Sequence, residues 1–519
     1  GRFEDLPDLE AEKGRGGRED DGHDDPLGLA DTIAAPDGTV ISFTDSIPWV
    51  SIFFKALRGV LPSTFQWFGW YTLFCFAMQG AASALLCARG QAKTGAGALV
   101  FSTLGGLLFV MLPTLWERAF RHTALASQWL FLLALYAFLE YRQNLHSGTA
   151  KFPWAMPVLA FLAVGIHPYF LPLVMMCALL AAVELGRQKK AWGRAALQLA
   201  ASLAAAVVGG ILCGAIGSGT GVSRSGYGDY SMNLNALINP TSRGGYTWSR
   251  LYQVMPQQPG QYDGFNYLGL GVLALITAAL LFSLRRAVRC PQNTTTWWHR
   301  NGPVFAACVF LTLFAVSNKI YWGNTGIELP LPAKLLELCG IFRSSGRMFY
   351  LVAACMVVYA VYTLRDRLPG RYAVLVLALF VGVQAFDLSA AAQQKRQKFA
   401  DPINATVVNN DQTASLGAGH TQLLAAGKVR EDRLRLLAIL AGRQGLATNL
   451  DIAVSGSHPA AEASRADTAA RLAAGQYDPT AVYVTTDGAT WENWQAVFAG
   501  DDSLNFFVAD SCYFMVPAA

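Results

Sequence analysis

The feature that most constrains this fold is a series of apolar segments, mostly 16 to 23 residues long, that contain almost no charged side chains. A helix rises about 1.5 Å per residue, so segments of this length match a bilayer hydrocarbon core about 30 Å thick. Only 14% of the 519 residues are charged and 53% are hydrophobic, whereas about a quarter charged is usual for soluble proteins. We therefore expect an α-helical polytopic membrane protein and not a soluble enzyme.

Ten such segments are expected to form membrane helices. They lie near residues 66–88, 95–115, 124–141, 154–166, 168–185, 195–216, 267–284, 303–318, 348–364 and 373–388. The region 153–185 is ambiguous, because its 33 residues fit either one very long helix or two passes broken at His167 and Pro168.

The distribution of basic residues favours two passes. If the region is split, five short loops fall on one face of the membrane and carry 15 Lys and Arg, while the loops of the opposite face are about twice as long and carry nine. The five loops are 89–93, 142–151, 187–194, 285–300 and 365–371. Cytoplasmic loops are enriched in Lys and Arg, so this face is predicted to be cytoplasmic. Lys189, Lys190 and Arg286 would then be cytoplasmic, and Asp45, Tyr230 and Leu450 external.

The chain divides into four regions by composition. Residues 1–25 hold ten acidic and four basic residues and read as a disordered tail or an artefact. Residues 26–65 are expected to be a first external loop, with an upstream membrane helix missing, and residues 66–388 the transmembrane domain. Residues 389–519 predict a small external α/β domain. Its expected helices are 431–446 and 460–475, and its expected strands 482–486, 506–510 and 513–517.

Asp45 is the first candidate functional residue. It precedes an apolar stretch of about 12 residues within 40–62 that is too short to span a membrane and is bounded by Pro48 and Pro62. This pattern predicts an interfacial helix with an acid at its N-terminal end. Thr44, Asp45 or Ser46 could equally supply a helix N-cap, a role that does not exclude catalysis.

A group of basic residues stands in the segment WERAFRHTAL, at the external ends of two predicted helices. Arg118, Arg121 and His122 fall within one helical turn and could converge on a phosphate. Their alternative role is to reach from the helix ends into the interface. Arg343 and Arg347 show the same ambiguity before the helix at 348, where they fit a pyrophosphate, a lipid headgroup or a simple flank.

Polar and aromatic residues mark two further external features. His167 interrupts an apolar region, so it needs a polar partner or a water-filled cavity, and it either caps backbone groups or contacts substrate. The long loop 217–266 contains Tyr227, Tyr230 and Asn266 among many Tyr, Asn, Gln and Gly residues. Such side chains suit sugar hydroxyls and ring faces, although they could also pack against the helices.

Several kinds of chemistry find no support in the sequence. Six of the nine cysteines lie inside apolar segments and none forms a close pair, so neither a disulfide scaffold nor a zinc site is indicated. No Gly-rich phosphate loop precedes a Lys-Ser or Lys-Thr pair. The basic residues follow membrane topology, so a nucleic-acid partner is not expected. No cofactor is assigned, although a divalent metal remains compatible with the sequence.

A series of motifs carries a family resemblance across residues 26–388. In order they are FTDSIPW, FGWYTLFCFAMQG, RAFRHTALASQWL, GIHPYF, YGDYSMNLNALINP, GQYDGFNYLGLG and FRSSGRM. In this order the chain resembles an uncharacterised bacterial family of polytopic membrane proteins related to the GT-C glycosyltransferases, which use polyprenyl-phosphate-linked sugars. The resemblance implies an inner-membrane enzyme that transfers a sugar to an external glycan or lipid acceptor. Asp45 would match the first-loop acid, and the external arginines the ligands of the donor phosphate.

Two other functional classes stay open at this stage. A transporter or flippase for a lipid-linked saccharide would use the same arginines and histidine, but transporters often show internal repeats with polar breaks in corresponding halves. The sequence has one such break, at residues 167 and 168, and no second copy. A noncatalytic assembly protein is the third reading, in which Asp45 could be lost without consequence.

Overall fold

The computed structural model describes residues 29–36, 38–62, 65–91, 95–216, 225–400, 410–452 and 459–518. The predicted tail at 1–25 lies outside these ranges. The chain forms two compact units. The first contains residues 1–68, 210–222 and 402–519, and the second contains residues 69–209 and 223–401.

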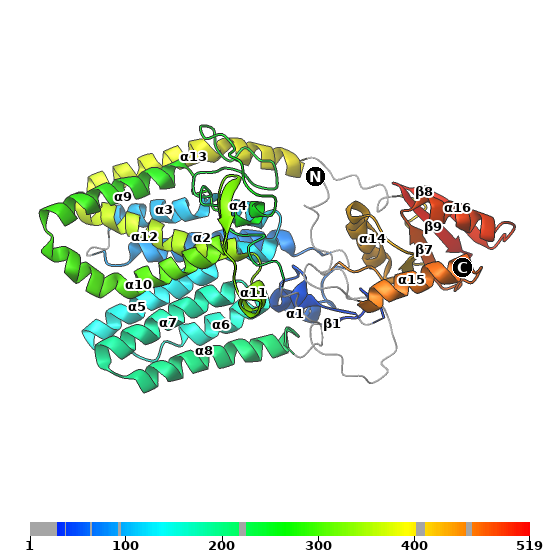
Figure 1. Cartoon of the computed structure of the whole chain (residues 1–519), viewed down its shortest axis with the longest axis horizontal. Helices are drawn as coiled ribbons and strands as arrows, with labels where there is room; N and C mark the ends of the chain where they lie inside the picture. Colours follow the sequence, from blue (N-terminus) through cyan, green and yellow to red (C-terminus); the bar gives the residue numbers. More distant parts are fainter. Residues whose placement is uncertain are drawn as a thin grey trace. The chain divides into compact units, whose positions relative to one another are not determined.

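The second unit is a helical bundle with a short β-hairpin (Figure 1). Its long helices are α2 (Phe68–Ala88), α3 (Ala96–Val110), α5 (Trp129–Ser147), α6 (Ala155–Ile166), α7 (Phe170–Lys189), α8 (Trp192–Leu212), α9 (Leu270–Arg289), α10 (Gln292–Val316), α12 (Phe349–Arg367) and α13 (Gly370–Ala400). Shorter elements are α4 (Pro113–Ala119), η3 (Thr123–Ala126), η4 (Gln261–Gly264), β3 (Lys319–Trp322), β4 (Thr325–Glu328), α11 (Ala333–Gly340) and η5 (Ser345–Met348).

Each of the ten predicted segments contains a helix. In the described part of the chain, eight helices are long and apolar enough to cross a membrane. A ninth span results if α3 and α4, which meet at a 54° bend, count as one. Helix α6 is apolar but has 12 residues, about 18 Å of helix, which is less than the bilayer core. The helices indicate a multi-pass membrane protein.

The region 153–185 is two helices and not one. Helix α6 ends at Ile166 and α7 begins at Phe170, with His167 in extended backbone between them. Proline lacks the N–H that a continuous helix needs and clashes with the preceding turn, so Pro168 explains the break. The two helices pack against each other and against α5.

Side-chain contacts bring the five predicted basic loops to one end of the bundle. Arg89 pairs with Glu140, and its carbonyl oxygen accepts a hydrogen bond from Arg365. Arg142 donates to the Asn301 side chain at 3.0 Å, and Arg187 donates to the His299 carbonyl at 2.9 Å. The grouping of these loops, which followed from splitting the region 153–185 into two passes, is confirmed. Which end faces the cytoplasm stays a prediction.

A buried carboxylate on α13 fixes the loop that precedes α9. Asp387 is fully buried and accepts hydrogen bonds from the Ser249 and Tyr267 hydroxyls at 2.6 and 2.7 Å. The backbone N–H groups of Arg250 and Leu270 also donate to it. Hydrogen bonding to several donors is what makes a buried carboxyl group tolerable in an apolar bundle. These bonds attach the loop between residues 249 and 270 to α13.

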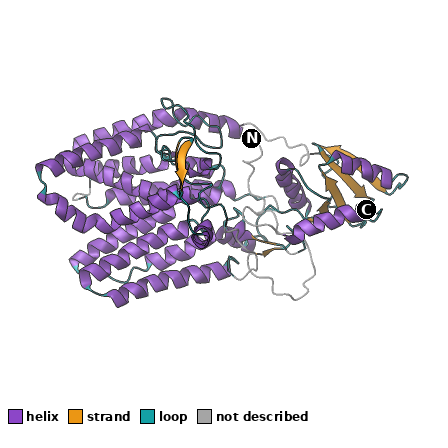
Figure 2. Cartoon of the chain, viewed as in Figure 1, coloured by secondary structure: helices purple, strands orange, loops and turns teal. Residues whose placement is uncertain are grey.

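The first unit contains a five-stranded mixed sheet with helices on both faces (Figure 2). Its elements are β5 (Gln422–Ala425), α14 (Glu431–Gln444), β6 (Ala447–Thr448), α15 (Pro459–Ala473), β7 (Ala481–Thr485), α16 (Gly488–Val497), β8 (Leu504–Ala509) and β9 (Cys512–Pro517), with the strand order β6-β5-β7-β9-β8. Strand side chains alternate between faces. Val482 and Val484 therefore join the core with α14, while Tyr483 joins that with α15 and α16. The predicted small α/β domain is confirmed.

The N-terminal segment belongs to the same unit as this sheet. A hairpin of β1 (Leu29–Ala30) and β2 (Thr39–Val40) flanks Ile33, which forms a parallel bridge to Thr448 of β6. The N–H of Ala34 donates to the Leu450 carbonyl at 3.0 Å. β6 lies at the edge of the sheet, and these contacts cover it. An uncovered edge strand could pair with a strand of another chain. Sequence reasoning, which treated 26–65 as a separate loop, did not anticipate them.

Asp45 lies in this unit, in the turn between η2 (Ile41–Phe43) and α1 (Pro48–Ala56). Its side chain is buried. The N-cap position of α1 is Ile47, which makes no side-chain cap, and the hydroxyls of Thr44 and Ser46 both donate to the Ile41 carbonyl. The alternative that Thr44 or Ser46 caps the helix is therefore wrong: these hydroxyls close the preceding turn.

Candidate functional site

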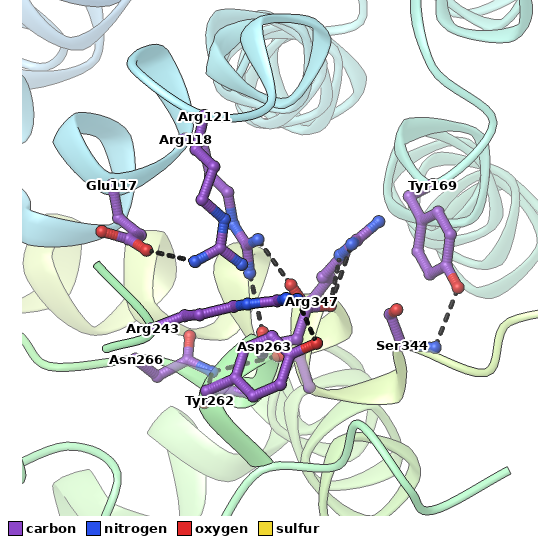
Figure 3. Close-up of polar contacts among 12 residues, drawn as sticks. Glu117, Arg118, Arg121, Tyr169, Arg243, Tyr262, Asp263, Asn266, Ser344 and Arg347 are labelled. Carbon is purple, nitrogen blue, oxygen red and sulfur yellow. Dashed lines mark hydrogen bonds and ion pairs between the residues drawn. The ribbon is translucent and has the colours of Figure 1, made fainter. Parts of the chain in front are cut away.

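A buried carboxylate between two arginines forms the centre of the site, at the end of the bundle opposite the basic loops. Arg118 contacts an Asp263 carboxylate oxygen at 2.5 Å, and Arg347 contacts the other at 2.9 Å. Arg118 also donates to the Asp263 carbonyl at 2.7 Å and to the Tyr350 hydroxyl at 2.9 Å. Figure 3 shows Asp263 with the two guanidinium groups directed toward it. All three nitrogens of the Arg118 guanidinium group thus donate hydrogen bonds within the protein.

The local sequence explains why three distant segments meet here. Arg118 lies in the last turn of α4, which starts at Pro113 just after α3 ends and so turns the chain across the end of the bundle. Arg347 lies in η5, directly before α12. A side chain on Gly264 would collide with the Ser231 carbonyl, and one on Gly346 would collide with Gly264. Glycine at both positions lets the loop backbone approach η5 closely enough for the ion pair.

The charge state of Asp263 follows from these neighbours. Burial alone would raise its pKa, but Arg118 and Arg347, with a further contribution from His122, hold the pKa well below its usual value. The carboxylate therefore stays ionised at neutral pH. A group held in this state by two guanidinium groups stabilises structure and is unsuited to accept a proton in catalysis.

Aromatic rings and further arginines surround this ion pair. Arg121 lies 5.5 Å and Arg243 4.9 Å from the centroid of the Tyr262 ring, and Arg243 donates to the Tyr262 hydroxyl at 2.9 Å. Arg343 lies 5.6 Å from the Tyr230 centroid, and the Tyr230 and Tyr262 rings meet edge to face. The group, which we call the arginine–tyrosine cluster, comprises Glu117, Arg118, Arg121, Tyr169, Tyr230, Arg243, Tyr262, Asp263, Arg343 and Arg347.

The cluster has more positive than negative charge. It contains five guanidinium groups and two carboxylates, and both carboxylates are engaged: Asp263 as described, and Glu117 with Arg121 at 2.9 Å. Arg243 is exposed and Arg343 is partly exposed. The planar guanidinium group has five N–H donors, which match the oxygens of a phosphate or a carboxylate. The cluster can bind an anion next to aromatic faces.

His167 lies close enough to feel the charges of this cluster. The backbone N–H of Tyr169 donates to its Nδ1 at 3.2 Å, so Nδ1 is the unprotonated nitrogen. The pKa of His167 is well below the usual value, mainly because the ring is buried. The positive charges of Arg347, His122 and Arg118 lower the pKa further, and the negative charge of Asp263 opposes them. The predicted break at His167 is confirmed, and its ring is neutral.

This pKa shift has a measurable consequence for stability. Below about pH 6.5 the unfolded chain binds a proton at His167 that the folded protein does not, so stability falls as pH decreases, by at most about 1.4 kcal/mol per pH unit. His167→Asn, whose side-chain oxygen can accept the Tyr169 N–H, should reduce this slope between pH 6.5 and 5. Unfolding of the purified protein in detergent at several pH values measures it. His146→Asn, at an exposed position on the opposite end of the bundle, is the control; equal slopes for wild type and His167→Asn would contradict the assignment.

Other predicted site residues have different surroundings. The Tyr227 hydroxyl donates to the Phe314 carbonyl at 3.2 Å and its ring packs on Phe314, so it contacts α10 and not the cluster. Asn266 is fully buried, and its amide donates to the carbonyls of Gly264 and Gly346. These bonds join the two backbone segments that carry Asp263 and Arg347. His122 occupies the N-cap position of η3 without a side-chain cap, and its charge lowers the pKa of Asp263. Asp45 belongs to the first unit.

Comparison with known families places these observations in context. Residues 18–389 match the model of a family described as a domain of unknown function, DUF6311, and residues 412–517 match the DUF6311 C-terminal domain. The chain belongs to the DUF6311 family. The longer match contains the whole arginine–tyrosine cluster. A comparison with curated proteins finds no significant match.

Five members of the cluster were not predicted from the sequence: Glu117, Tyr169, Arg243, Tyr262 and Asp263. All except Arg243 lie inside the quoted segments, beside residues that were predicted. One signal was present: arginines gathered at one face of an apolar bundle require a carboxylate among them if they are to be buried. Among the described residues, no three His, Cys, Asp or Glu side chains gather in a way that could hold a metal ion.

Proposed function

We propose that this chain is a membrane glycosyltransferase that takes a sugar from a polyprenyl-phosphate donor and transfers it to a glycan or lipid acceptor outside the cytoplasm. The observation that supports this most directly is the surplus of guanidinium groups beside tyrosine rings at one end of a membrane bundle. A lipid-linked sugar has the complementary parts: a prenyl chain for the bilayer, a phosphate at its surface and a sugar ring beyond.

Individual residues of the cluster have separate proposed roles. Arg243 and Arg343 contact the donor phosphate: Arg243 is the exposed guanidinium group of the cluster, and Arg343 is half-buried beside the Tyr230 ring. Arg121 and Arg347 add positive charge to the site. Arg118 is a positioning residue, because its guanidinium group donates to Tyr350 and Asp263. Tyrosine rings offer flat apolar faces with a polar edge, which suits a sugar ring.

The proposed reaction is a displacement at the anomeric carbon. The acceptor hydroxyl oxygen attacks that carbon, Asp45 takes the hydroxyl proton, and the bond between the carbon and the phosphate oxygen breaks with its electron pair on the phosphate. The arginines stabilise the negative charge that grows on the departing lipid phosphate. Asp263 is not the base in this scheme, because two arginines lower its pKa so far that the carboxylate is a poor proton acceptor.

We also propose ten membrane crossings, with the basic loops in the bacterial cytoplasm and the C-terminal domain outside. Residues 32–35 and 448–450 belong to one folded unit, so the bundle that separates them in sequence must cross the membrane an even number of times. Eight spans, the bent α3–α4 pair and α6 together satisfy this requirement. The positive-inside rule supports the orientation.

Substitution of Arg343 tests the proposed donor site. Arg343→Ala should weaken binding of a polyprenyl phosphate at least tenfold, because a charge-assisted hydrogen bond contributes about 1.5 to 3 kcal/mol, and sugar transfer should fall with it. Equilibrium binding in detergent and transfer from a radiolabelled donor are measured separately.

Arg250→Ala is the matched control for this experiment. Arg250 likewise lies beside an aromatic ring, 5.7 Å from the Phe386 centroid, but it is outside the cluster, so its loss should change binding less than twofold. Unchanged binding in Arg343→Ala would reject the donor site. If the protein moved the lipid-linked sugar between the two leaflets of a vesicle membrane and did not transfer the sugar to an acceptor, a flippase would be supported instead.

A further inference from the structure

A buried lysine in an aromatic enclosure lies outside the arginine–tyrosine cluster. Lys395 is 4% exposed, near the C-terminal end of α13. Its Nζ lies 3.9 Å from the Tyr246 ring centroid, 4.9 Å from that of Phe120 and 5.4 Å from that of Trp248. Within the part of the chain that the structure describes, this ammonium has aromatic contacts only, with no hydrogen bond or ion pair.

The enclosure is held in place by contacts on either side of the lysine. Gln394 accepts a hydrogen bond from the Thr247 N–H at 2.8 Å and donates to the Thr247 hydroxyl at 3.0 Å. The Trp248 indole N–H donates to the Ser242 hydroxyl at 2.7 Å. Thr247 lies between Tyr246 and Trp248 in sequence, so these bonds fix both rings around Lys395.

An ammonium group in this position lacks its usual partners. It has three N–H donors, and cation–π contact supplies part of the stabilisation that water would give, but no acceptor. The acid whose charge acts on Lys395 is Glu117, which already pairs with Arg121. A buried charge without a counter-ion is unfavourable, and a bound anion removes that penalty.

We propose that Lys395 is a second anion-binding point and takes an oxyanion of the ligand bound at this end of the bundle. The chemistry fits either the outer phosphate of a diphosphate linkage or a carboxylate on the sugar acceptor. This inference deepens the proposed function, since it gives the donor or the acceptor an additional acidic group, but the binding itself does not depend on sugar transfer.

The test measures inorganic pyrophosphate binding to the full chain in detergent, at constant ionic strength. Lys395→Gln should weaken binding about tenfold, and Lys395→Arg should restore most of it. Lys398→Gln is the matched control: Lys398 is three residues further on the same helix and lies 5.8 Å from the same Tyr246 ring. Its substitution should change affinity less than twofold.

Unfolding temperature separates ligand binding from a structural role. Removing an unpaired buried charge should leave the ligand-free Lys395→Gln protein at least as stable as wild type, and pyrophosphate should raise the unfolding temperature of wild type more than that of the variant. A destabilised Lys395→Gln protein with wild-type pyrophosphate affinity would overturn the proposal, whether or not the wild type transfers sugar.

The same assay with other probes identifies the source of the oxyanion. Affinity that depends on Lys395 for polyprenyl diphosphate but not for polyprenyl monophosphate assigns the group to the donor. The same dependence for glucuronate assigns it to the acceptor. Loss of the dependence for all three probes and for pyrophosphate would reject the site.

Discussion

Asp263→Ala is expected to destabilise the helical unit by about 3 to 5 kcal/mol, a large share of the roughly 5 to 15 kcal/mol by which folded proteins are stable. The substitution leaves two guanidinium groups facing each other: the Arg118 side chain is 1% exposed and that of Arg347 is 11% exposed. Neither can recover its hydration without opening the end of the bundle. Yield of monodisperse protein and thermal unfolding in detergent measure the effect.

Asp229→Ala provides the comparison for this prediction. Asp229 pairs with Lys319 at 2.6 Å, but their side chains are 48% and 31% exposed, and exposed ion pairs contribute about 0 to 1 kcal/mol. The triple variant Arg118→Met, Arg347→Met and Asp263→Leu should recover much of the lost stability, because apolar side chains can replace a buried ion pair. Wild-type stability in Asp263→Ala alone would show that the arginines have other partners.

The pH dependence of this contribution has a definite sign. The pKa of Asp263 is lower in the folded protein than in the unfolded chain. Its stabilisation is therefore complete above the unfolded value of about 4 and is lost as pH falls from there toward the folded value. The loss of stability from protonation of Asp263 occurs at lower pH than the loss from His167, so one series of unfolding measurements over pH separates the two.

The membrane helices could be predicted because one property, the length of uncharged apolar segments, determines them. The paired loops at one end followed from charge, and the break at Pro168 from the missing backbone N–H. Helix α13 was underestimated, since it runs to Ala400 and not to 388. Its last turns consist mainly of Ala, Gln, Lys and Arg, which favour helix without being apolar.

The centre of the site could not be predicted, for a physical reason. Arg118 and Asp263 are 145 residues apart in sequence, and no periodicity relates them. Their contact depends on the bend between α3 and α4 and on the close approach of Gly264 to Gly346. The enclosure of Lys395 likewise combines rings from two loops with one helix. The sequence indicated which side chains were costly to bury, and the fold supplied their partners.

Asp45→Asn is expected to lower the turnover of sugar transfer by about 10² to 10⁴ if Asp45 is the base, with the affinity for polyprenyl phosphate changed less than threefold. The amide keeps the shape of the side chain but cannot accept the hydroxyl proton. The turn around it is well defined: Ile47 has a φ of 53°, a conformation unfavourable for a β-branched residue. The Ser42 hydroxyl donates to the Cys213 carbonyl at 2.5 Å. Residues held in such conformations cluster at functional sites.

The assay separates catalysis from folding and from donor binding. Asp31→Asn changes an exposed acid in the same segment and should leave turnover intact. Asp45→Glu keeps the carboxylate and should retain more activity than Asp45→Asn if proton transfer is the role, whereas a purely structural role would make the longer side chain the more harmful change. Full transfer activity in Asp45→Asn, with wild-type unfolding temperature, would remove Asp45 as the base and leave the arginine–tyrosine cluster as a binding site without an assigned catalytic group.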